Sequence, residues 1–283
     1  MEFWSHLNPR RYRKSGYIAI GALIGVLAGS AVSLFRYMIG FILEQVVTVY
    51  SFLREQPQWI PVWILFSLVM GVILGQIVKS DPDIKGSGIP QVELQLQGKM
   101  DMKWWSVCWK KFVGGAISIG SGLLLGREGP SIQLGASVGQ GVAETFKANR
   151  VQKNVFISSG AGAGLAAAFN APIAGLMFVL EEVHHTFSPL VAVTTLTAAI
   201  VANFISLNIF GTHASLNLGN DQRFPINYYG YVVLLGIILA IFGLAYHRLT
   251  LALPTIYKKL FPKVAPYNYC IIAFMLIIPL GMW

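Results

Sequence analysis

Long apolar runs separated by short polar stretches form the pattern of this chain. The run at residues 17–50 carries only two charges, Arg36 and Glu44, and is long enough for one strongly tilted membrane helix. Residues 59–78 predict a second span without interruption. Later spans are predicted at residues 190–210, 228–253 and 266–283. The pattern therefore predicts an all-α polytopic membrane protein.

Three shorter apolar runs lie between these spans, and glycine or proline interrupts them. Residues 131–143, 155–168 and 171–180 are each too short to cross a bilayer alone, which is typical of broken helices packed inside a bundle. Small residues recur at every fourth position of the middle run and are expected to let a neighbouring helix approach closely: Gly160, Gly164 and Ala168.

The composition supports a membrane protein and limits the meaning of its positive charge. Only 12% of the 283 residues are charged and 55% are hydrophobic, whereas soluble domains carry about 25% charged residues. The formal net charge of +9 does not predict a nucleic-acid partner, because the basic residues form short clusters beside apolar runs. One cluster predicts a cytoplasmic N-terminus for a multi-pass protein of the cell membrane: Arg10, Arg11, Arg13 and Lys14.

A charged loop interrupts the apolar pattern in the middle of the chain. Residues 104–125 are apolar apart from Lys110 and Lys111, and they lead directly into Gly126-Arg127-Glu128-Gly129-Pro130. Ionisable groups at membrane depth are costly and usually line a polar pathway. The glycines permit an irregular backbone, and Pro130 suits the first turn of a helix. The loop is predicted to break one helix and open another with its amides aimed at an anion. A short connection outside the bilayer is the alternative.

A second loop, Gly86-Ser87-Gly88-Ile89-Pro90, has the same flexible glycines and the same proline at a helix start. The Ser87 hydroxyl and the amides of Gly88 and Ile89 can replace part of an anion's hydration shell without a full positive charge. An ordinary helix start capped by Ser87 is the alternative. Two such loops around one long apolar run favour an anion site.

Glu128 is the candidate gate of this site. The two helix starts favour its ionised form, whereas burial favours its protonated form. A group balanced in this way can occupy an anion site as a carboxylate and leave it on protonation. A structural ion pair with Arg127 or a lysine is the alternative.

Glu181 and Glu182 end the last short run and precede His184 and His185. A carboxylate that relays protons at the cytoplasmic mouth of a pathway fits this position, and so does a solvated helix end. Glu181 and His185 share a helical face, but no further ligands support a metal site.

The sequence carries no enzyme or cofactor signature. Residues 160–164 alternate glycine and alanine without the spacing or strand context of a dinucleotide loop, and are interpreted as a packing segment. A nucleophile elbow, a P-loop and a zinc signature are all missing. Cys108 and Cys270 lie in apolar runs and are interpreted as reduced thiols. We therefore expect no enzymatic activity and no cofactor.

The two loops, together with the segment Gly164–Pro172 and the pair Glu181-Glu182, closely resemble motifs of the CLC chloride channels and chloride/proton antiporters. The resemblance implies an inverted-repeat helical bundle with broken helices, with the first repeat at about residues 17–210 and the start of the second at about 228–283. It also implies that Glu128 is the gating, proton-accepting residue and that Glu182 is the inner proton-transfer residue. The residues implied to bind chloride are Ser87, Gly88, Ile89, Pro90, Gly126, Arg127, Gly129 and Pro130.

The resemblance further implies transport of chloride in exchange for protons, and a homodimer in the lipid bilayer that pairs through residues 171–210. Serine at position 87 favours chloride over nitrate or fluoride within the family. A voltage-gated chloride channel without proton coupling remains the alternative within this family.

The chain departs from the family pattern in its second half. No Gly-x-Phe-x-Pro loop follows residue 230, and the family's C-terminal pore tyrosine has no counterpart. The bundle is therefore expected to be truncated, whether as a gene product, an expression fragment or one subunit of a split protein. The competing hypothesis, from a different functional class, is a membrane fragment that cannot transport by itself and only associates with partners.

Overall fold

Helices form all the regular structure in the described part of the chain. A computed structural model describes residues 14–184, 187–212, 225 and 228–283, and these residues contain no strand. The α-helices are α1 (Lys14–Glu55), α2 (Ile60–Ser80), α3 (Ile89–Leu96), α4 (Trp104–Gly120), α5 (Glu128–Thr145), α6 (Arg150–Phe169), α7 (Pro172–Phe178), α8 (Pro189–Phe210), α9 (Tyr229–Leu260) and α10 (Tyr269–Met282). Shorter helices are η2 (Pro57–Trp59), η3 (Pro82–Ile84), the π-helix η4 (Val179–Val183) and η6 (Pro266–Asn268).

Four helical segments among the described residues are long and apolar enough to cross a membrane: Ser15–Glu55, Pro57–Ser80, Pro189–Phe210 and Tyr229–Leu260. They match four of the predicted spans, and the protein is a multi-pass membrane protein. The 42 residues of α1 correspond to about 63 Å of helix, about twice the hydrocarbon thickness of a bilayer. A single helix of that length must tilt steeply or extend beyond the hydrocarbon region.

Three predicted boundaries were wrong. α4 ends at Gly120 rather than continuing to residue 125, because the chain turns at Gly122, whose φ of +85° favours glycine. α5 and α6 have 18 and 20 residues, although the apolar runs there predicted shorter helices. Polar and small residues extend both helices beyond those runs. Only α7, with 7 residues, has the predicted short form.

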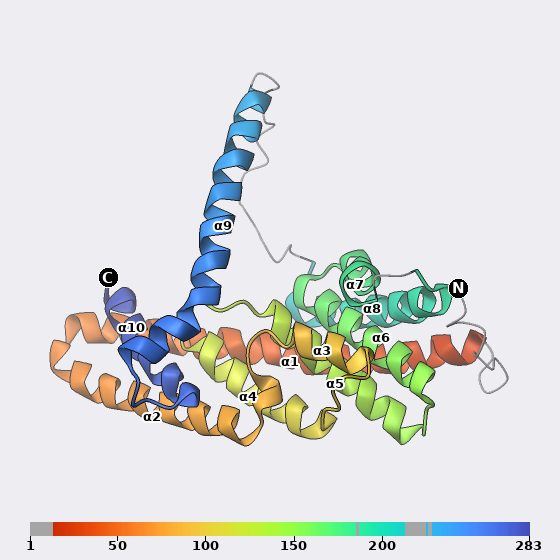
Figure 1. The fold of residues 1–283 in the computed structure, drawn as a ribbon, viewed down its shortest axis with the longest axis horizontal. Coiled ribbons are helices and arrows are strands. Elements are labelled where there is room, and N and C mark those ends of the chain that lie inside the picture. Colours follow the sequence, from red (N-terminus) through yellow and green to blue (C-terminus); the bar gives the residue numbers. More distant parts are fainter. Residues whose placement is uncertain (1–13, 185–186, 213–224, 226–227) are drawn as a thin grey trace.

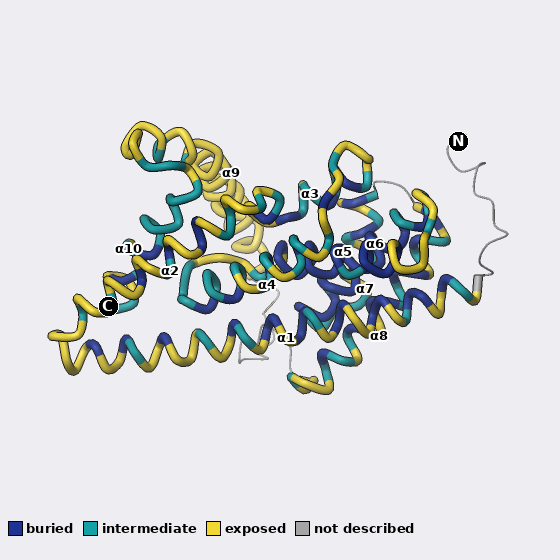
Figure 2. The backbone as a smooth tube through the Cα atoms, turned by 90° about the horizontal axis from the view of Figure 1, so that it is seen from below, coloured by how far each residue is buried: buried dark blue, intermediate teal, exposed yellow. Residues whose placement is uncertain are grey.

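The best-buried part of the molecule lies where α5 packs against α6 (Figure 2). An added Cβ would lie 2.9 Å from the carbonyl carbon of Gly160 at Gly135, and 3.1 Å from that of Ser131 at Gly164. Such distances are too short for any side chain, so the two helix backbones are in direct contact. This confirms the close packing predicted from Gly160 and Gly164.

A second stripe of glycines brings α1 against α8. An added Cβ at Gly21 would lie 2.8 Å from the carbonyl oxygen of Thr194, and one at Gly29 would lie 2.6 Å from the Cα of Ala202. Lipid gives helices no hydrophobic reason to associate, so close backbone packing is what holds such pairs together. The stripe therefore brings the backbones of α1 and α8 into contact through three small residues of α1: Gly21, Gly25 and Gly29.

Arg36, the charge within the first apolar run, connects α1 to the end of α6 and to α8. Its Nη1 donates to the carbonyl oxygen of Ala167 at 2.6 Å and to Ser206 Oγ at 2.7 Å, and the guanidinium lies 4.1 Å from the ring centre of Phe210. Hydrogen bonds to a charged group contribute about 1.5–3 kcal/mol each. The guanidinium also neutralises the negative end of the α6 dipole. Arg36 is therefore a structural residue of the bundle.

α10 lies beside α2, whereas α9 extends away from the other helices (Figure 1). An added Cβ at Gly71 of α2 would lie 2.9 Å from the Cα of Ile271, and Arg54 Nη2 donates to the carbonyl oxygen of Gly281 at 3.0 Å. These contacts join α10 to α2 and to the end of α1. No residue of α9 is buried.

Candidate functional site

The two glycine-proline loops lie against each other, at the starts of α3 and α5. An added Cβ at Gly129 would lie 2.7 Å from the Cβ of Ser87 and 2.8 Å from its Cα, so only glycine permits this approach. Pro90 and Pro130 lie in the first turns of the two helices, as predicted. The fold therefore brings together two positive helix ends that are far apart in the sequence.

The helix start at Ser87 was predicted either to bind an anion or to be capped by Ser87, and the structure differs in part from each prediction. Gly88, with φ of +93°, is the N-cap residue of α3, so the N-cap predicted for Ser87 was wrong by one position. Ser87 Oγ nevertheless accepts from the Ile89 amide at 3.3 Å. The Ile89 amide, which was predicted to face an anion, is thus partly engaged. Ser87 is exposed, and its hydroxyl hydrogen has no acceptor in the described part of the chain.

A buried lysine holds the backbone just ahead of Ser87. Lys111 of α4 is 5% exposed, and its Nζ donates to the carbonyl oxygens of Ile84 at 2.9 Å and Gly86 at 2.7 Å. Gln91 Nε2 donates to the carbonyl oxygen of Lys85 at 2.8 Å. Among the described residues no carboxylate pairs with Lys111. Its charge therefore adds to the positive potential behind the loop.

Two aspartates lie in the turn between α2 and this loop. Asp81 accepts from Ser106 and pairs with Lys110, with 3.4 Å between Oδ2 and Nζ. Burial, and secondarily the charge of Asp81, raise the pKa of the Asp83 carboxyl above its ordinary value. A raised pKa means that folding favours the protonated carboxyl. The free energy of unfolding is therefore highest below the unfolded-state pKa of Asp83, and this advantage is lost as the pH rises through the folded-state pKa.

Glu128 is the first residue of α5, and its side chain is exposed. Its carboxylate folds back over Gly126, where any side chain would collide with Oε2. No cation among the described residues lies within ion-pair distance of it, so the predicted alternative of a structural ion pair was wrong. Arg127 instead lies over the ring of Phe169, 5.9 Å from its centre. The carboxylate is therefore not neutralised and lies beside two helix starts.

Glu181 and Glu182 lie in the π-helix η4, and both are exposed. η4 packs against α3, the helix that begins at the Ser87 loop, and against α6. His184 Nε2 and Ser158 Oγ are 2.7 Å apart, which fastens the end of η4 to α6. Exposure fits a proton entry and a solvated helix end alike, so both interpretations of Glu182 stand.

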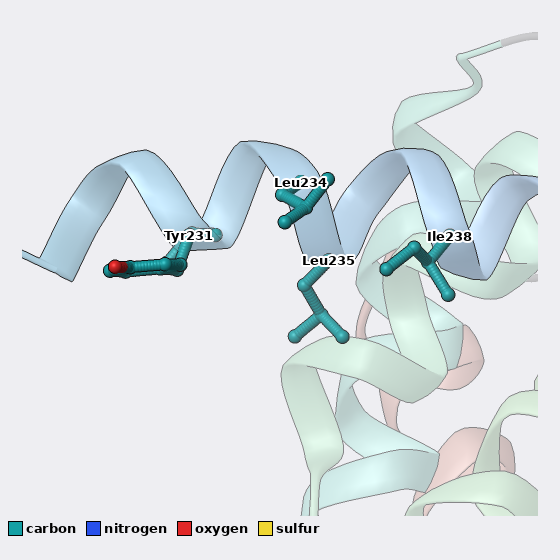
Figure 3. A pocket seen from close by; sticks show the side chains of 5 residues that line it. Tyr231, Leu234, Leu235 and Ile238 are labelled. Atoms are coloured by element: carbon teal, nitrogen blue, oxygen red, sulfur yellow. The ribbon is translucent and has the colours of Figure 1, made fainter.

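No metal site accompanies these residues in the described part of the chain. The described residues contain no group of three metal-ligating side chains, and His185, half of the weak metal pair, lies outside them. A shallow apolar hollow occurs on α9 (Figure 3), and one face of that helix supplies its whole lining: Tyr231, Val232, Leu234, Leu235 and Ile238. Apart from the Tyr231 hydroxyl, its lining is apolar.

Sequence reasoning missed the residues that hold the site together. Lys111 was noted only as an interruption of an apolar run, and Gln133 of α5 was not noted at all. A signal was present in the spacing of polar residues, which recur every three or four positions on one face of α5: Gln133, Ser137, Gln140 and Glu144.

Comparison with known proteins agrees with this arrangement. A sequence model of the family described as voltage gated chloride channel matches residues 66–283. The H(+)/Cl(-) exchange transporter ClcA of Vibrio cholerae is 33% identical over 257 residues, which cover 86% of this chain and 52% of the relative. The chain therefore spans about half the length of the curated relatives that it matches.

Two solved structures share the fold. A slow cyanobacterial Cl−/H+ antiporter superposes with a TM-score of 0.83 and 31% identity, over 94% of this chain and 63% of that one. A CLC-type fluoride/proton antiporter superposes with a TM-score of 0.74 and 25% identity, over 94% of this chain and 65% of that one. The resemblance inferred from the motifs is confirmed.

Proposed function

Because this chain belongs to the voltage gated chloride channel family, we propose that it moves chloride in exchange for protons, with Glu128 as the gate. The observation that carries this proposal is the contact between the Ser87 loop and Gly129, which sets an unpaired carboxylate beside two helix starts. Positive helix ends attract chloride and the Glu128 carboxylate to the same place.

The proposed roles follow the two loops and the π-helix. Ser87 and the amides of its loop bind the central anion, and the second loop supplies the other positive helix end. Glu128 competes with chloride when ionised and accepts a proton when it leaves. Glu182 supplies that proton from the inner side, since η4 packs on α3. The first repeat spans about residues 17–210, a second repeat begins at about 228, and the N-terminus lies in the cytoplasm of a cell-membrane protein.

Coupled flux in liposomes tests the proposed function. The chain is reconstituted as given and, separately, extended by any coding sequence that continues in frame after Trp283 or lies in an adjacent frame. We expect an outward chloride gradient to drive protons inward against their own gradient. Chloride flux without proton movement would indicate a channel instead, and no flux in either preparation would leave a membrane fragment that only associates with partners.

The Ser87 hydroxyl should contribute modestly to chloride binding. Removing one neutral donor from a site with several amide donors should cost about 0.5–1.5 kcal/mol. Calorimetric titration of chloride into wild type and Ser87→Ala measures this difference. Ser118→Ala serves as the control, because Ser118 Oγ donates to Gly114 within its own helix at 2.7 Å. Unchanged affinity and unchanged chloride-over-nitrate preference in Ser87→Ala would remove Ser87 from the site.

We also propose a homodimer that pairs through α7 and α8. Large apolar side chains are exposed on these helices, with Ile173 at 70%, Ile200 at 51% and Phe204 at 66%. A cysteine at Ile200, in a background without Cys108 and Cys270, should cross-link two chains in bilayers. A cysteine at Leu65 of α2, which is 63% exposed, should not. Monomer alone at every protein-to-lipid ratio would contradict this pairing.

A further inference from the structure

Gln133 is a buried polar residue beside the two loops, and the proposed function assigns it no role. It lies on α5, little more than one turn after Glu128, and its side chain is 0% exposed. Burying a side-chain amide costs free energy unless both its nitrogen and its oxygen are hydrogen-bonded, so a buried glutamine here calls for an explanation.

The amide nitrogen of Gln133 holds the turn just ahead of the Ser87 loop. Nε2 donates to the carbonyl oxygen of Asp83 at 2.8 Å, and it lies 3.9 Å from Met102 Sδ. Asp83 precedes Ser87 by four residues, so this bond links α5 to η3, the turn just ahead of the loop. It supplements the two bonds from Lys111 to the carbonyl oxygens of Ile84 and Gly86.

The rest of the Gln133 side chain presses against the end of the same loop. An added Cβ at Gly88 would lie 2.6 Å from Gln133 Cδ and 2.8 Å from Gln133 Cβ. Gln133 therefore fills the space in which a side chain at position 88 would lie. Gly88 is the left-handed N-cap residue of α3, so its conformation decides where the Ser87 hydroxyl and the following amide point.

The carbonyl end of Gln133 has no partner, which separates this residue from an ordinary packing residue. Oε1 is buried and accepts no hydrogen bond from the described residues. A leucine would fill a similar volume without burying an unpaired acceptor. A leucine could not make the two polar contacts of Gln133 Nε2, which are with the Asp83 carbonyl just ahead of the Ser87 loop and with Met102 Sδ. The bond to Asp83 argues for a role in placing that loop.

We propose that Gln133 is a positioning residue that fixes the Ser87 loop relative to the start of α5, and so sets the distance between the anion site and the Glu128 carboxylate. This inference rests on the proposed function for its consequence, weaker chloride binding, but not for its structural part. One helix carries both Glu128 and Gln133, so a single rigid element places the gate and holds the loop.

Gln140 provides a matched control on the same helix. It is 1% exposed, and its Nε2 donates to the carbonyl oxygen of Met102 at 2.8 Å and to Glu144 Oε1 at 2.9 Å. Its Oε1 accepts from Gln95 at 2.6 Å. It is as buried as Gln133 and better hydrogen-bonded, yet no hydrogen bond among the described residues links it to residues 83–88. A leucine at position 140 should therefore disturb α5 without moving the loop.

Amide hydrogen exchange and chloride titration of the full chain together test the proposal. In Gln133→Leu, we expect exchange of residues 84–88 to speed up by about tenfold or more, and chloride affinity to fall by about the same factor. Gln140→Leu should leave both within about twofold of wild type. As the pH falls, the chloride affinity of Gln133→Glu should rise more steeply than that of wild type, because only the protonated carboxyl at position 133 can donate to Asp83.

Three results would overturn the proposal. The first is unchanged exchange of residues 84–88 in Gln133→Leu. The second is equal acceleration in Gln133→Leu and Gln140→Leu, which would indicate general loosening of α5. The third is unchanged chloride affinity in a Gln133→Leu protein whose loop does exchange faster.

Two further results remain informative. If Gln133→Leu does not fold, Gln133→Met takes its place with the same expectations and the same contradicting outcomes. If the wild-type chain binds no chloride, the proposed function fails for this chain alone, whereas the exchange data still decide whether Gln133 places the loop.

Discussion

Replacing Glu128 with glutamine should abolish proton movement while chloride still flows. Glutamine has the shape of the protonated carboxyl, carries no charge and cannot take up or release a proton at any working pH. In liposomes that hold the protein described above, coupled proton flux should fall by at least about tenfold, to the level of empty liposomes. Chloride efflux should continue and should lose its dependence on pH.

The physical reason lies in the position of Glu128 at the start of α5. The carboxylate has no counter-ion among the described residues, and the start of α3 lies beside it through the contact of Gly129 with Ser87. The positive ends of both helices therefore stabilise a negative charge there, whether it belongs to chloride or to Glu128. Glutamine cannot compete for that place, so the anion path stays open.

Glu144→Gln is the matched control for this substitution. Glu144 lies near the other end of α5, where it accepts from Gln140 and pairs with Lys153 at 3.2 Å. Surface ion pairs contribute little, about 0–1 kcal/mol, so this variant should behave like wild type. Full proton coupling in Glu128→Gln would show that Glu128 is not the gate.

Replacing Glu182 with glutamine should stop proton movement and leave chloride flux intact. Glu182 lies in η4, which packs on α3. We expect it to supply protons from one side without touching the anion. We expect coupled proton flux to fall by about tenfold or more, while the pH dependence of chloride flux from the other side survives because Glu128 is still present.

Glu181→Gln tests whether position 182 is specific. Both carboxylates lie side by side in the same π-helix, and both are exposed. If η4 is only a solvated helix end, the two substitutions should have equal and small effects. Loss of coupling in Glu182→Gln alone would support the relay. Retained coupling in Glu182→Gln, with the expected behaviour of Glu128→Gln, would remove only the inner relay.

The spans and the two loops could be predicted because their signals are local. A run of apolar residues as long as a bilayer is thick predicts a helix without knowledge of its partners, as at residues 59–78 and 190–210. Glycine and proline at fixed offsets predicted the helix starts at Pro90 and Pro130 for the same reason. The alternating glycines at residues 160–164 correctly indicated packing.

The tertiary contacts could not be predicted, because their partners are remote in the sequence. Arg36 was visible only as a lone charge, and its acceptor at Ala167 lies 131 residues away. Lys111 was visible only as an interruption of an apolar run and Gln133 was not noted, since the backbone carbonyls that they bind leave no trace in the sequence. Helix length was wrong at α5 and α6 because polar and small residues at their ends, such as Glu144 and Asn154, continue each helix beyond its apolar run.

Chloride titration at several pH values shows whether chloride and the Glu128 carboxylate compete for one place between two helix starts. We expect chloride to bind wild type more tightly as the pH falls, because protonation removes the competing carboxylate, and we expect Glu128→Gln to bind it equally well at every pH. Chloride affinity that is independent of pH in wild type, or that depends on pH equally in Glu128→Gln, would contradict this competition.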